Sequence, residues 1–457
     1  MRGLSVRNLL YACCPGPLRP LWQRIEASDV GYRLARGTFW ALAGTLIARA
    51  LALLAGILTA RIFGDTVRFG EFGIIRSTIE MLGVFAGFGL GLTSTKHVAE
   101  YYKTDPERAG RVLALTAVTS ALIAGSACVF LAIAAPWLAD SQLNAPHLAS
   151  SLRLCAPLLF FTALNGAQLG ALTGFEAFRT TAYVNSFGAI VAFPLLVLGA
   201  FFGGLKGSLW GLNFAAFFQY LIAHFALRRV AAWQNVKFQF AGFAHELPLV
   251  WGFSIPAALS GILVAPVNWW CNTLLTKIAN GYSELGIYHA AQQWRLAIMF
   301  LPSILALVAM PMFSRTQGEG NIGRLKRLLL VNLALNAIVS AAIALPIVLF
   351  APLIMSSYGT QYSDSSTVLV LLAIASAISA TVQVVGQLIA SMGKMWQGFA
   401  LNLVWAACFT AAAWWLYTDG ARGLATANLL AYSVHLVTVG TYSWFVAFPA
   451  VSQPKKG

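Results

Sequence analysis

The chain has 457 residues, of which 59% are hydrophobic and only 10% are charged, and its mean hydropathy is +0.73. Soluble domains carry roughly 25% charged residues, so this composition excludes an ordinary soluble protein and predicts an all-α polytopic membrane protein. Because one helical span needs about 20 apolar residues, the length allows about twelve spans joined by short loops. Membrane topology accounts for most of the net charge of +15, so we expect no nucleic-acid partner.

The predicted elements begin with a basic cytoplasmic leader over residues 1–35. The six spans of a predicted N-lobe, residues 36–228, follow at 37–63, 71–97, 111–137, 148–172, 180–203 and 207–228. A predicted cytoplasmic linker, 229–246, leads to a C-lobe, residues 247–449, with spans at 247–276, 285–313, 327–355, 365–391, 397–417 and 423–448. A short tail, 450–457, is predicted to be cytoplasmic.

The basic residues predict the orientation of these spans. If the N-terminus is cytoplasmic, 21 of the 30 Lys and Arg fall in the leader, the even-numbered loops and the tail, and 5 fall in the opposite loops. Cytoplasmic loops of membrane proteins carry an excess of Lys and Arg. We therefore predict that both termini are cytoplasmic and that the number of spans is even.

The six cysteines predict packing rather than chemistry. They stand at positions 13, 14, 128, 155, 271 and 408, and no His lies at ligand spacing to the adjacent pair. Free Cys is commonly buried as a small hydrophobic residue. We expect no metal and no cofactor.

The two halves of the chain contain a weak internal repeat. Residues 71–74 (EFGI) return 213 positions later as 284–287 (ELGI), and Gly-Arg at 110–111 returns at 323–324. The matches keep one order and one polarity, which indicates a parallel duplication of a hydrophobic half. Many transporters are built in this way, with the substrate path between the halves.

Five charged residues fall inside predicted spans: Arg49, Arg76, Glu80, Arg153 and Arg295. A charge at mid-bilayer costs at least ~2.5 kcal/mol, so such residues should face a bundle interior or a hydrated cavity. At ~1.5 Å per residue, Arg49, Glu80 and Arg295 lie about 20, 14 and 17 Å along their spans, near the middle of the bilayer. Arg153 is close to the end of its span.

Arg76 and Glu80 are four residues apart and therefore share a helix face. One interpretation is an ion pair that neutralises both charges and lets the helix insert. The other is ion coupling, with Glu80 as the carrier of a proton, because no other acidic residue lies as deep in a predicted span.

Arg49 and Arg295 have no acidic residue left to pair with inside the spans. They could bond to carbonyl groups and to the nearby Gln292 or Gln293. Alternatively, Arg49, Arg76 and Arg295 with the two glutamines form a cationic, substrate-binding chamber. We favour the chamber, which would accept an anionic substrate.

Several short motifs resemble the polysaccharide-transport flippases, the Wzx-type O-antigen transporters of the multidrug/oligosaccharidyl-lipid/polysaccharide (MOP) exporter superfamily. The resemblance covers residues 36–450. Its motifs are GFGLGLT at 87–93, VAEY at 98–101, LTGFE within 170–178, ELGIY at 284–288, AAQQWR at 290–295 and FLP at 300–302.

The resemblance implies a MATE-like MOP fold, with two six-helix lobes around a central cavity in the bacterial inner membrane. It implies alternating access and a cargo of undecaprenyl-diphosphate-linked oligosaccharide, an O-antigen or exopolysaccharide repeat unit, moved to the periplasmic leaflet. The diphosphate would lie beside Arg49 and Arg295, because guanidinium groups suit phosphate geometry. Membrane lipids, a polysaccharide polymerase and a chain-length regulator are the expected partners, and no enzymatic activity is expected.

Two other functions stay open at this point. A MATE-like, cation-coupled drug exporter would share the fold, but such relatives commonly use an Asp in the first helix and the first predicted span has none. A membrane-embedded polysaccharide polymerase or ligase would need a sizeable outer loop with catalytic groups. The longest predicted outer loops, 138–147 and 356–364, are short.

Overall fold

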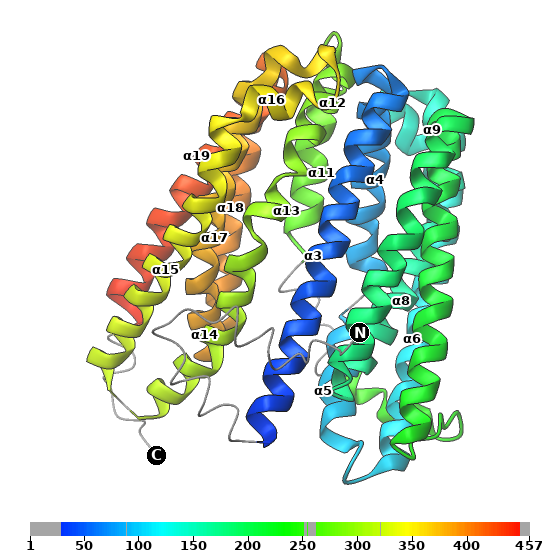
Figure 1. The fold of residues 1–457 in the computed structure, drawn as a ribbon, viewed down its shortest axis with the longest axis vertical. Coiled ribbons are helices and arrows are strands. Elements are labelled where there is room, and N and C mark those ends of the chain that lie inside the picture. Colours follow the sequence, from blue (N-terminus) through cyan, green and yellow to red (C-terminus); the bar gives the residue numbers. More distant parts are fainter. Residues whose placement is uncertain (1–28, 88, 251–253, 255–261, 320, 448–457) are drawn as a thin grey trace, which may run out of the picture.

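The computed structural model describes residues 29–87, 89–250, 254, 262–319 and 321–447, and the regular structure of these residues is entirely helical. Long helices run roughly side by side and form two groups, which Figure 1 shows as a left-hand and a right-hand half. The first 28 residues of the predicted leader and the predicted tail, 450–457, lie outside the described residues.

The right-hand group is the N-lobe. Its helices are α3 (Asp29–Phe63), α4 (Thr66–Gly87), α5 (Leu90–Tyr101), α6 (Pro106–Trp137), α7 (Ala149–Leu154), α8 (Ala156–Gly174) and α9 (Phe178–Trp233). Short π and 3-10 turns, Leu138–Gln142 and Pro146–Leu148, join α6 to α7.

The left-hand group is the C-lobe. Its helices are α11 (Val264–Leu275), α12 (Gly281–Gln292), α13 (Arg295–Ile298), α14 (Phe300–Gly318), α15 (Ile322–Leu349), α16 (Ala351–Ser356), α17 (Ser366–Ser391), α18 (Met395–Leu416) and α19 (Gly420–Tyr442). Short irregular helices of this lobe occupy Thr360–Ser365, Tyr417–Asp419 and Ser443–Ala447, and another, Phe243–Glu246, belongs to the segment between the lobes.

Helix α9 contains two antiparallel helices rather than one long one. Gly204 breaks it with φ 55° and ψ −135°, a conformation that only glycine adopts without strain. The halves then pack so closely that a Cβ atom at Gly207 would stand 2.0 Å from the carbonyl oxygen of Gly199. The break coincides with the predicted gap between the fifth and sixth spans. The second half runs to Trp233, five residues beyond the predicted end at 228.

The span count agrees with the predicted twelve as far as the described residues reach. Eight described segments are long and apolar enough to cross a bilayer, and the bent pair 281–298 and 300–317 adds a ninth. Two of the eight, 178–233 and 395–445, each hold two antiparallel helices, which brings the described passes to eleven. The predicted seventh span, 247–276, includes residues outside the described part of the chain.

Two predicted spans are interrupted helices. The second span is divided between α4 and α5 at Gly89, which has a left-handed φ of 66°. The eighth is divided among α12, α13 and α14, with a bend of 43°. Helices broken within a membrane are tolerated where the freed backbone groups face protein or a cavity, so each break marks a candidate site.

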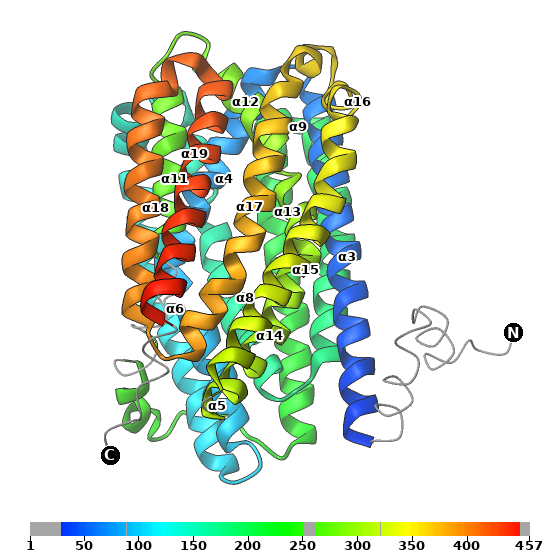
Figure 2. The same ribbon diagram turned by 90° about the vertical axis from the view of Figure 1, so that its left-hand side faces the viewer.

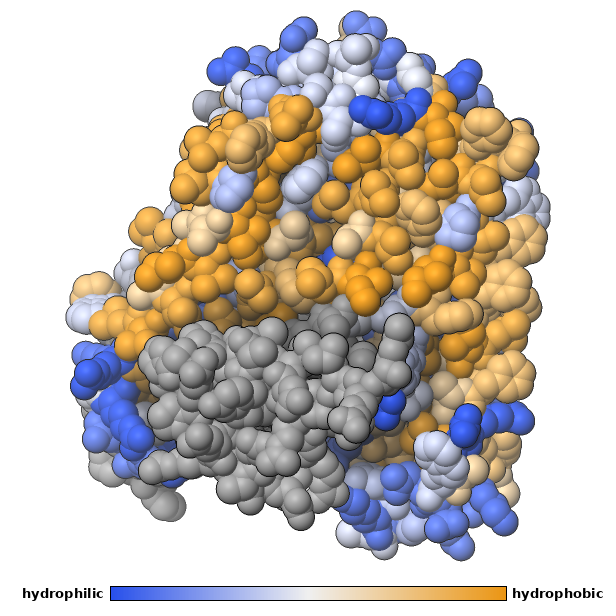
Figure 3. Space-filling view, viewed as in Figure 1, coloured by the Kyte–Doolittle hydropathy of each residue, from blue (hydrophilic) through white to orange (hydrophobic). Residues whose placement is uncertain are grey.

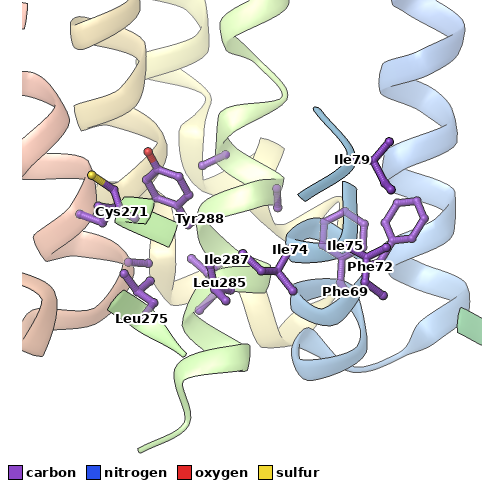
Figure 4. Close-up of a cluster of buried hydrophobic side chains, with 14 of the residues drawn as sticks. Phe69, Phe72, Ile74, Ile75, Ile79, Cys271, Leu275, Leu285, Ile287 and Tyr288 are labelled. Atoms are coloured by element: carbon purple, nitrogen blue, oxygen red, sulfur yellow. The ribbon is translucent and has the colours of Figure 1, made fainter. Parts of the chain in front are cut away.

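The lobes are joined at one end, where the repeat motifs of α4 and α12 meet. A Cβ atom at Gly70 would stand 1.9 Å from the carbonyl oxygen of Tyr282, and one at Gly286 would stand 2.1 Å from that of Thr66. Inside a membrane, helices associate through such close packing of small residues, because lipid removes most of the hydrophobic driving force. Figure 4 shows the apolar side chains of α4, α12 and α11 that fill this contact, among them Ile74 and Leu285.

Hydrogen bonds between the lobes reinforce this joint, which we call the closed end. They connect Thr66 Oγ1 with Ser283 Oγ (2.7 Å), Tyr282 Oη with the Leu143 carbonyl (2.7 Å), Arg61 Nε with the Ser357 carbonyl (2.6 Å) and Gln361 Nε2 with the Gly64 carbonyl (2.8 Å). The ribbons of α5 and α14, at the opposite end, lie apart in Figure 1. The side view in Figure 2 shows α14 and α17 descending toward that same end.

The surface has the pattern of a membrane protein. On the face that Figure 3 shows, apolar residues cover much of the middle of the molecule and hydrophilic residues gather at both ends. The end opposite the closed end carries the loops after α5, α8, α9, α14 and α17, where most of the basic residues lie. This end is therefore the one that the distribution of charge predicts to be cytoplasmic.

The segment after α9 is attached to the N-lobe rather than free. The buried carboxylate of Glu246 accepts hydrogen bonds from Arg108 Nε at 3.2 Å and from Arg111 Nε at 3.4 Å. The backbone of Gln239 donates to the carbonyl of Gly110. The described part of the linker should consequently move with the N-lobe.

Candidate functional site

A cavity of about 320 Å³ lies where α4 of the N-lobe faces α11, α12 and α13 of the C-lobe. We call it the central cavity. Its lining begins beside the glycine contact of the closed end, at Phe69 and Gly73 of α4. The polar residues that line it are Arg76, Ser77, Glu80, Asn268, Asn272, His289, Gln292, Gln293 and Arg295.

Arg295 lies at the break of the eighth predicted span, as the first residue of α13. Its Nη2 donates to Tyr432 Oη at 2.8 Å and to Ser379 Oγ at 3.2 Å, and its guanidinium lies 5.0 Å from the centre of the Tyr432 ring. Both bonds use Nη2, so Nε and Nη1 have no hydrogen-bond partner among the described residues. The hydroxyl groups hold the side chain in place without neutralising it.

Arg49 reaches from α3 to the same break. Its Nη1 donates to the carbonyl of Leu296 at 2.5 Å, and its guanidinium lies 5.0 Å from the centre of the Phe300 ring. The bend between α13 and α14 interrupts the backbone hydrogen bonds of the helix here, which leaves the Leu296 carbonyl available. Carbonyl bonding, one of the two interpretations that the sequence left open for Arg49, is therefore present. Among the ion pairs of the described residues, none includes Arg49 or Arg295.

Arg76 and Glu80 lie on one face of α4, with Nη2 and Oε1 3.5 Å apart. Their side chains are 46% and 67% exposed, so the pair is loose and contributes at most ~1 kcal/mol. Arg76 also lines two neighbouring cavities, one of about 250 Å³ with Arg49 and one of about 290 Å³ inside the N-lobe. It thus stands between the other two arginines and keeps capacity to bind an anion.

Three polar side chains of α12 and its end turn toward this region without partners. His289 Nε2 and the Oε1 atoms of Gln292 and Gln293 are buried, and none of these atoms has a hydrogen-bond partner within the described residues. Gly56 permits the approach of Gln293, because a Cβ atom there would stand 2.0 Å from Gln293 Oε1. Buried polar groups without partners are rare and point to a ligand or to water.

The structure thus brings Arg49, Arg76, Arg295, Gln292 and Gln293 together around the broken helix, with Glu80 beside them. Sequence reasoning did not select His289, Ser379 or Tyr432 as site residues. The spacing of His289 and Gln292 on one helix face was an available signal. Isolated Ser and Tyr residues in apolar helices carry no such signal. No cluster that could hold a metal ion occurs among the described residues.

Residues 34–317 match the family described as polysaccharide biosynthesis protein. The chain belongs to that family. It is 27% identical over 356 residues to the EPS I polysaccharide export inner membrane protein EpsE of Ralstonia nicotianae, covering 76% of this chain and 78% of that protein. It is 25% identical over 305 residues to the lipid III flippase of Escherichia coli, covering 64% and 70% of the two chains.

Solved structures of other proteins share the fold of this chain. An inward-facing multidrug resistance MATE transporter of the MOP superfamily superposes with a TM-score of 0.73 at 16% identity, over 91% of this chain and 99% of that one. The lipid II flippase MurJ, in an inward closed conformation, gives 0.69 at 13% identity, over 90% and 89%. The predicted MATE-like MOP fold is confirmed, and the described passes are consistent with twelve helices.

The family and its relatives also confirm the general function. They are export proteins and flippases of polysaccharide biosynthesis, and the expectation of a membrane transport protein rather than an enzyme is confirmed. The relative from Ralstonia nicotianae is named as an inner membrane protein, and the apolar spans of this chain agree with a location in a membrane.

Proposed function

We propose that this chain is a flippase that moves an undecaprenyl-diphosphate-linked oligosaccharide, a polysaccharide repeat unit, from the cytoplasmic to the periplasmic leaflet. The observation that carries the proposal is the group of three arginines around the broken helix between the lobes. Within the described part of the chain, Arg49 and Arg295 have no carboxylate partner. A diphosphate has the charge and the acceptor oxygens that such a group requires. Relatives named for polysaccharide export and for lipid III flipping support the same substrate class.

Alternating access follows from the arrangement of the two lobes. The site lies beside the contact between α4 and α12, so separation of the lobes at the closed end would expose the site to that side. Closure at the opposite end would seal the other side. With the basic end in the cytoplasm, this structure corresponds to a state closed toward the periplasm and ready to load cargo from within.

A cation-coupled drug exporter is the alternative with the same fold. The described residues of the first span, α3 beyond its first turn, contain no acidic residue, and Glu80 is the one carboxylate that lines the central cavity among the described residues. A group of three arginines is unfavourable for cationic drugs, because like charges repel in a low-dielectric cavity. We therefore favour the anionic cargo.

The direct test uses purified protein in proteoliposomes that contain undecaprenyl diphosphate linked to a labelled oligosaccharide. A membrane-impermeant glycosidase reports the label in the outer leaflet. We expect active vesicles to expose nearly all of the label, whereas vesicles without protein should expose only the outer-leaflet share. Equal exposure in both preparations, together with cation-driven drug efflux, would replace this proposal by the drug exporter.

We predict that both the C-terminal tail and the linker at 234–241 are cytoplasmic, since the basic residues gather at that end of the bundle. Fusions of green fluorescent protein at the two positions should fluoresce, and alkaline phosphatase fusions at the same positions should be inactive. Fusions in the loop at 356–360 serve as the opposite control. Phosphatase activity at the tail would show that the orientation is the reverse of the predicted one.

We predict that Glu80→Gln removes the pH dependence of transport while the protein still inserts. Glu80 is loosely paired with Arg76 and lines the cavity, so its carboxylate can exchange protons during the cycle, whereas a glutamine cannot. Flux is measured between pH 5 and 8 in the proteoliposomes described above. Glu284→Gln, at the contact with the start of α19, is the control acid. An unchanged pH profile would leave Glu80 only as a structural partner of Arg76.

A further inference from the structure

A second polar pocket lies inside the C-lobe, away from the central cavity. It has a volume of about 270 Å³ and lies between α17, α18 and α19. Its polar lining consists of Gln383, Gln387, Asn402 and His435, with Phe399 at its side, and the lining residues include no charged group. A neutral polar lining in the interior of a membrane protein is costly unless it binds something.

The pocket continues from the side chains that hold Arg295. On α17, Gln383 and Gln387 follow Ser379 at intervals of four residues, which is about 6 Å per step along one helix face. On α19, His435 comes three residues after Tyr432, the other partner of Arg295. Ser303 of α14 approaches Gln383 at 3.4 Å. A continuous polar track therefore runs from Arg295 toward the basic end of the molecule.

Several groups in the pocket have unused hydrogen-bonding capacity. His435 is only 7% exposed, and its Nδ1 atom has no partner within the described residues. The side-chain amides of Gln387 and Asn402 make no hydrogen bond to other described residues. An amide offers both donors and acceptors, and a neutral imidazole offers one of each, which is the set that sugar hydroxyl groups require.

The cavity described inside the N-lobe is more apolar than this pocket. It has a similar volume, about 290 Å³, but is lined mainly by Ala, Leu, Ile and Phe apart from Arg76, Glu80 and Thr162. The N-lobe also places a glutamine beside a histidine, but there Gln168 Nε2 lies 3.4 Å from His224 Nδ1, so the two side chains contact each other. In the C-lobe, Gln387 and His435 both line the pocket, and no hydrogen bond joins them within the described residues.

We propose that the polar pocket between α17, α18 and α19 is a sugar subsite, which binds the neutral sugar next to the diphosphate of the cargo. This inference rests on the proposed flippase function and adds to it the position of the glycan. With the diphosphate at Arg295, the first sugar would lie one helical turn away, beside Gln383 and His435. The amides of Gln387 and Asn402 then select among sugars, since a site built to bond hydroxyl groups rejects ligands that lack them.

The test measures binding of three probes to purified full-length protein in detergent: undecaprenyl diphosphate alone, and the same lipid carrying one hexose or one N-acetylhexosamine. We expect the wild type to bind at least one sugar-linked lipid more tightly than the sugar-free lipid. Gln387→Leu and Asn402→Leu should each weaken binding of the sugar-linked lipid about tenfold, which is the effect of about one lost hydrogen bond. Neither variant should change the affinity for the sugar-free lipid. Gln397→Leu is the matched control, because Gln397 is an exposed residue of α18 outside the pocket.

Each other outcome has a distinct meaning. Equal affinity of the wild type for all three probes would overturn the subsite. The subsite would also be overturned if the Leu variants changed the affinity for sugar-linked and sugar-free lipid by the same factor, or changed neither affinity. If the wild type binds none of the three lipids, the proposed flippase function fails together with the inference. Arg295→Ala should weaken binding of all three probes, because it removes the contact with the diphosphate that they share.

Discussion

Arg295→Ala is expected to abolish export, and Arg295→Lys to retain part of it. The guanidinium of Arg295 is held by Ser379 and Tyr432 and presents Nε and Nη1 to the cavity region. Hydrogen bonds to charged groups contribute about 1.5–3 kcal/mol each, so loss of two should lower transport at least ~100-fold. Lysine keeps the charge but lacks the fork that binds two phosphate oxygens. The assay is surface polysaccharide in a flippase-deficient cell, with the amount of protein in the membrane measured in parallel.

Arg153→Ala is the matched control for this experiment. Arg153 lies on the short helix α7, with an exposed side chain that donates to the carbonyl of Ala132 at 3.0 Å, away from the central cavity. We expect it to leave export within a few-fold of the wild type, because a long side chain near a span end can reach water. Full surface polysaccharide from a normally inserted Arg295→Ala protein would exclude Arg295 as the phosphate-binding residue.

A disulfide across the closed end is expected to stop transport, and a reductant is expected to restore it. Thr66 and Ser283 lie on opposite lobes with their hydroxyl oxygens 2.7 Å apart, so cysteines at both positions are placed for a disulfide. Alternating access requires these helices to separate, and a covalent link forbids separation. The double variant is made in a background without the native cysteines at 13, 14, 128, 155, 271 and 408. Flux is measured before and after reduction.

The single variants Thr66→Cys and Ser283→Cys control for the loss of the hydroxyl contact. Each should keep most of the activity, because replacing one partner of a single neutral hydrogen bond costs only ~1 kcal/mol. Full transport by protein whose cross-link is complete would show that the closed end never opens. The two lobes would then have to pass the cargo by another route.

The apolar lengths of the spans were predictable because the bilayer imposes them. Runs of about 20 apolar residues identify a helix wherever it lies, and the described helices follow the predicted spans closely. The breaks were not predictable in the same way. The apolar run continues across Gly89, and neither glycine nor proline marks the break within 293–299, so the lengths of the apolar runs do not reveal where the backbone hydrogen bonds are interrupted. Likewise the end of α9 at Trp233 lies past the apolar run, since the helix continues into water.

The sequence alone determined the class of protein and the identity of the charged residues within the spans, and it predicted the duplication. Each of these depends on composition or on spacing within one helix, where a regular period relates residues to one face. The tertiary structure alone decided the partners of those charges. Arg295 bonds to residues 84 and 137 positions away, and Arg49 to a carbonyl 247 positions away. Helical periodicity says nothing about which helix lies opposite, because that depends on how glycine contacts such as Gly70 and Gly286 bring the lobes together.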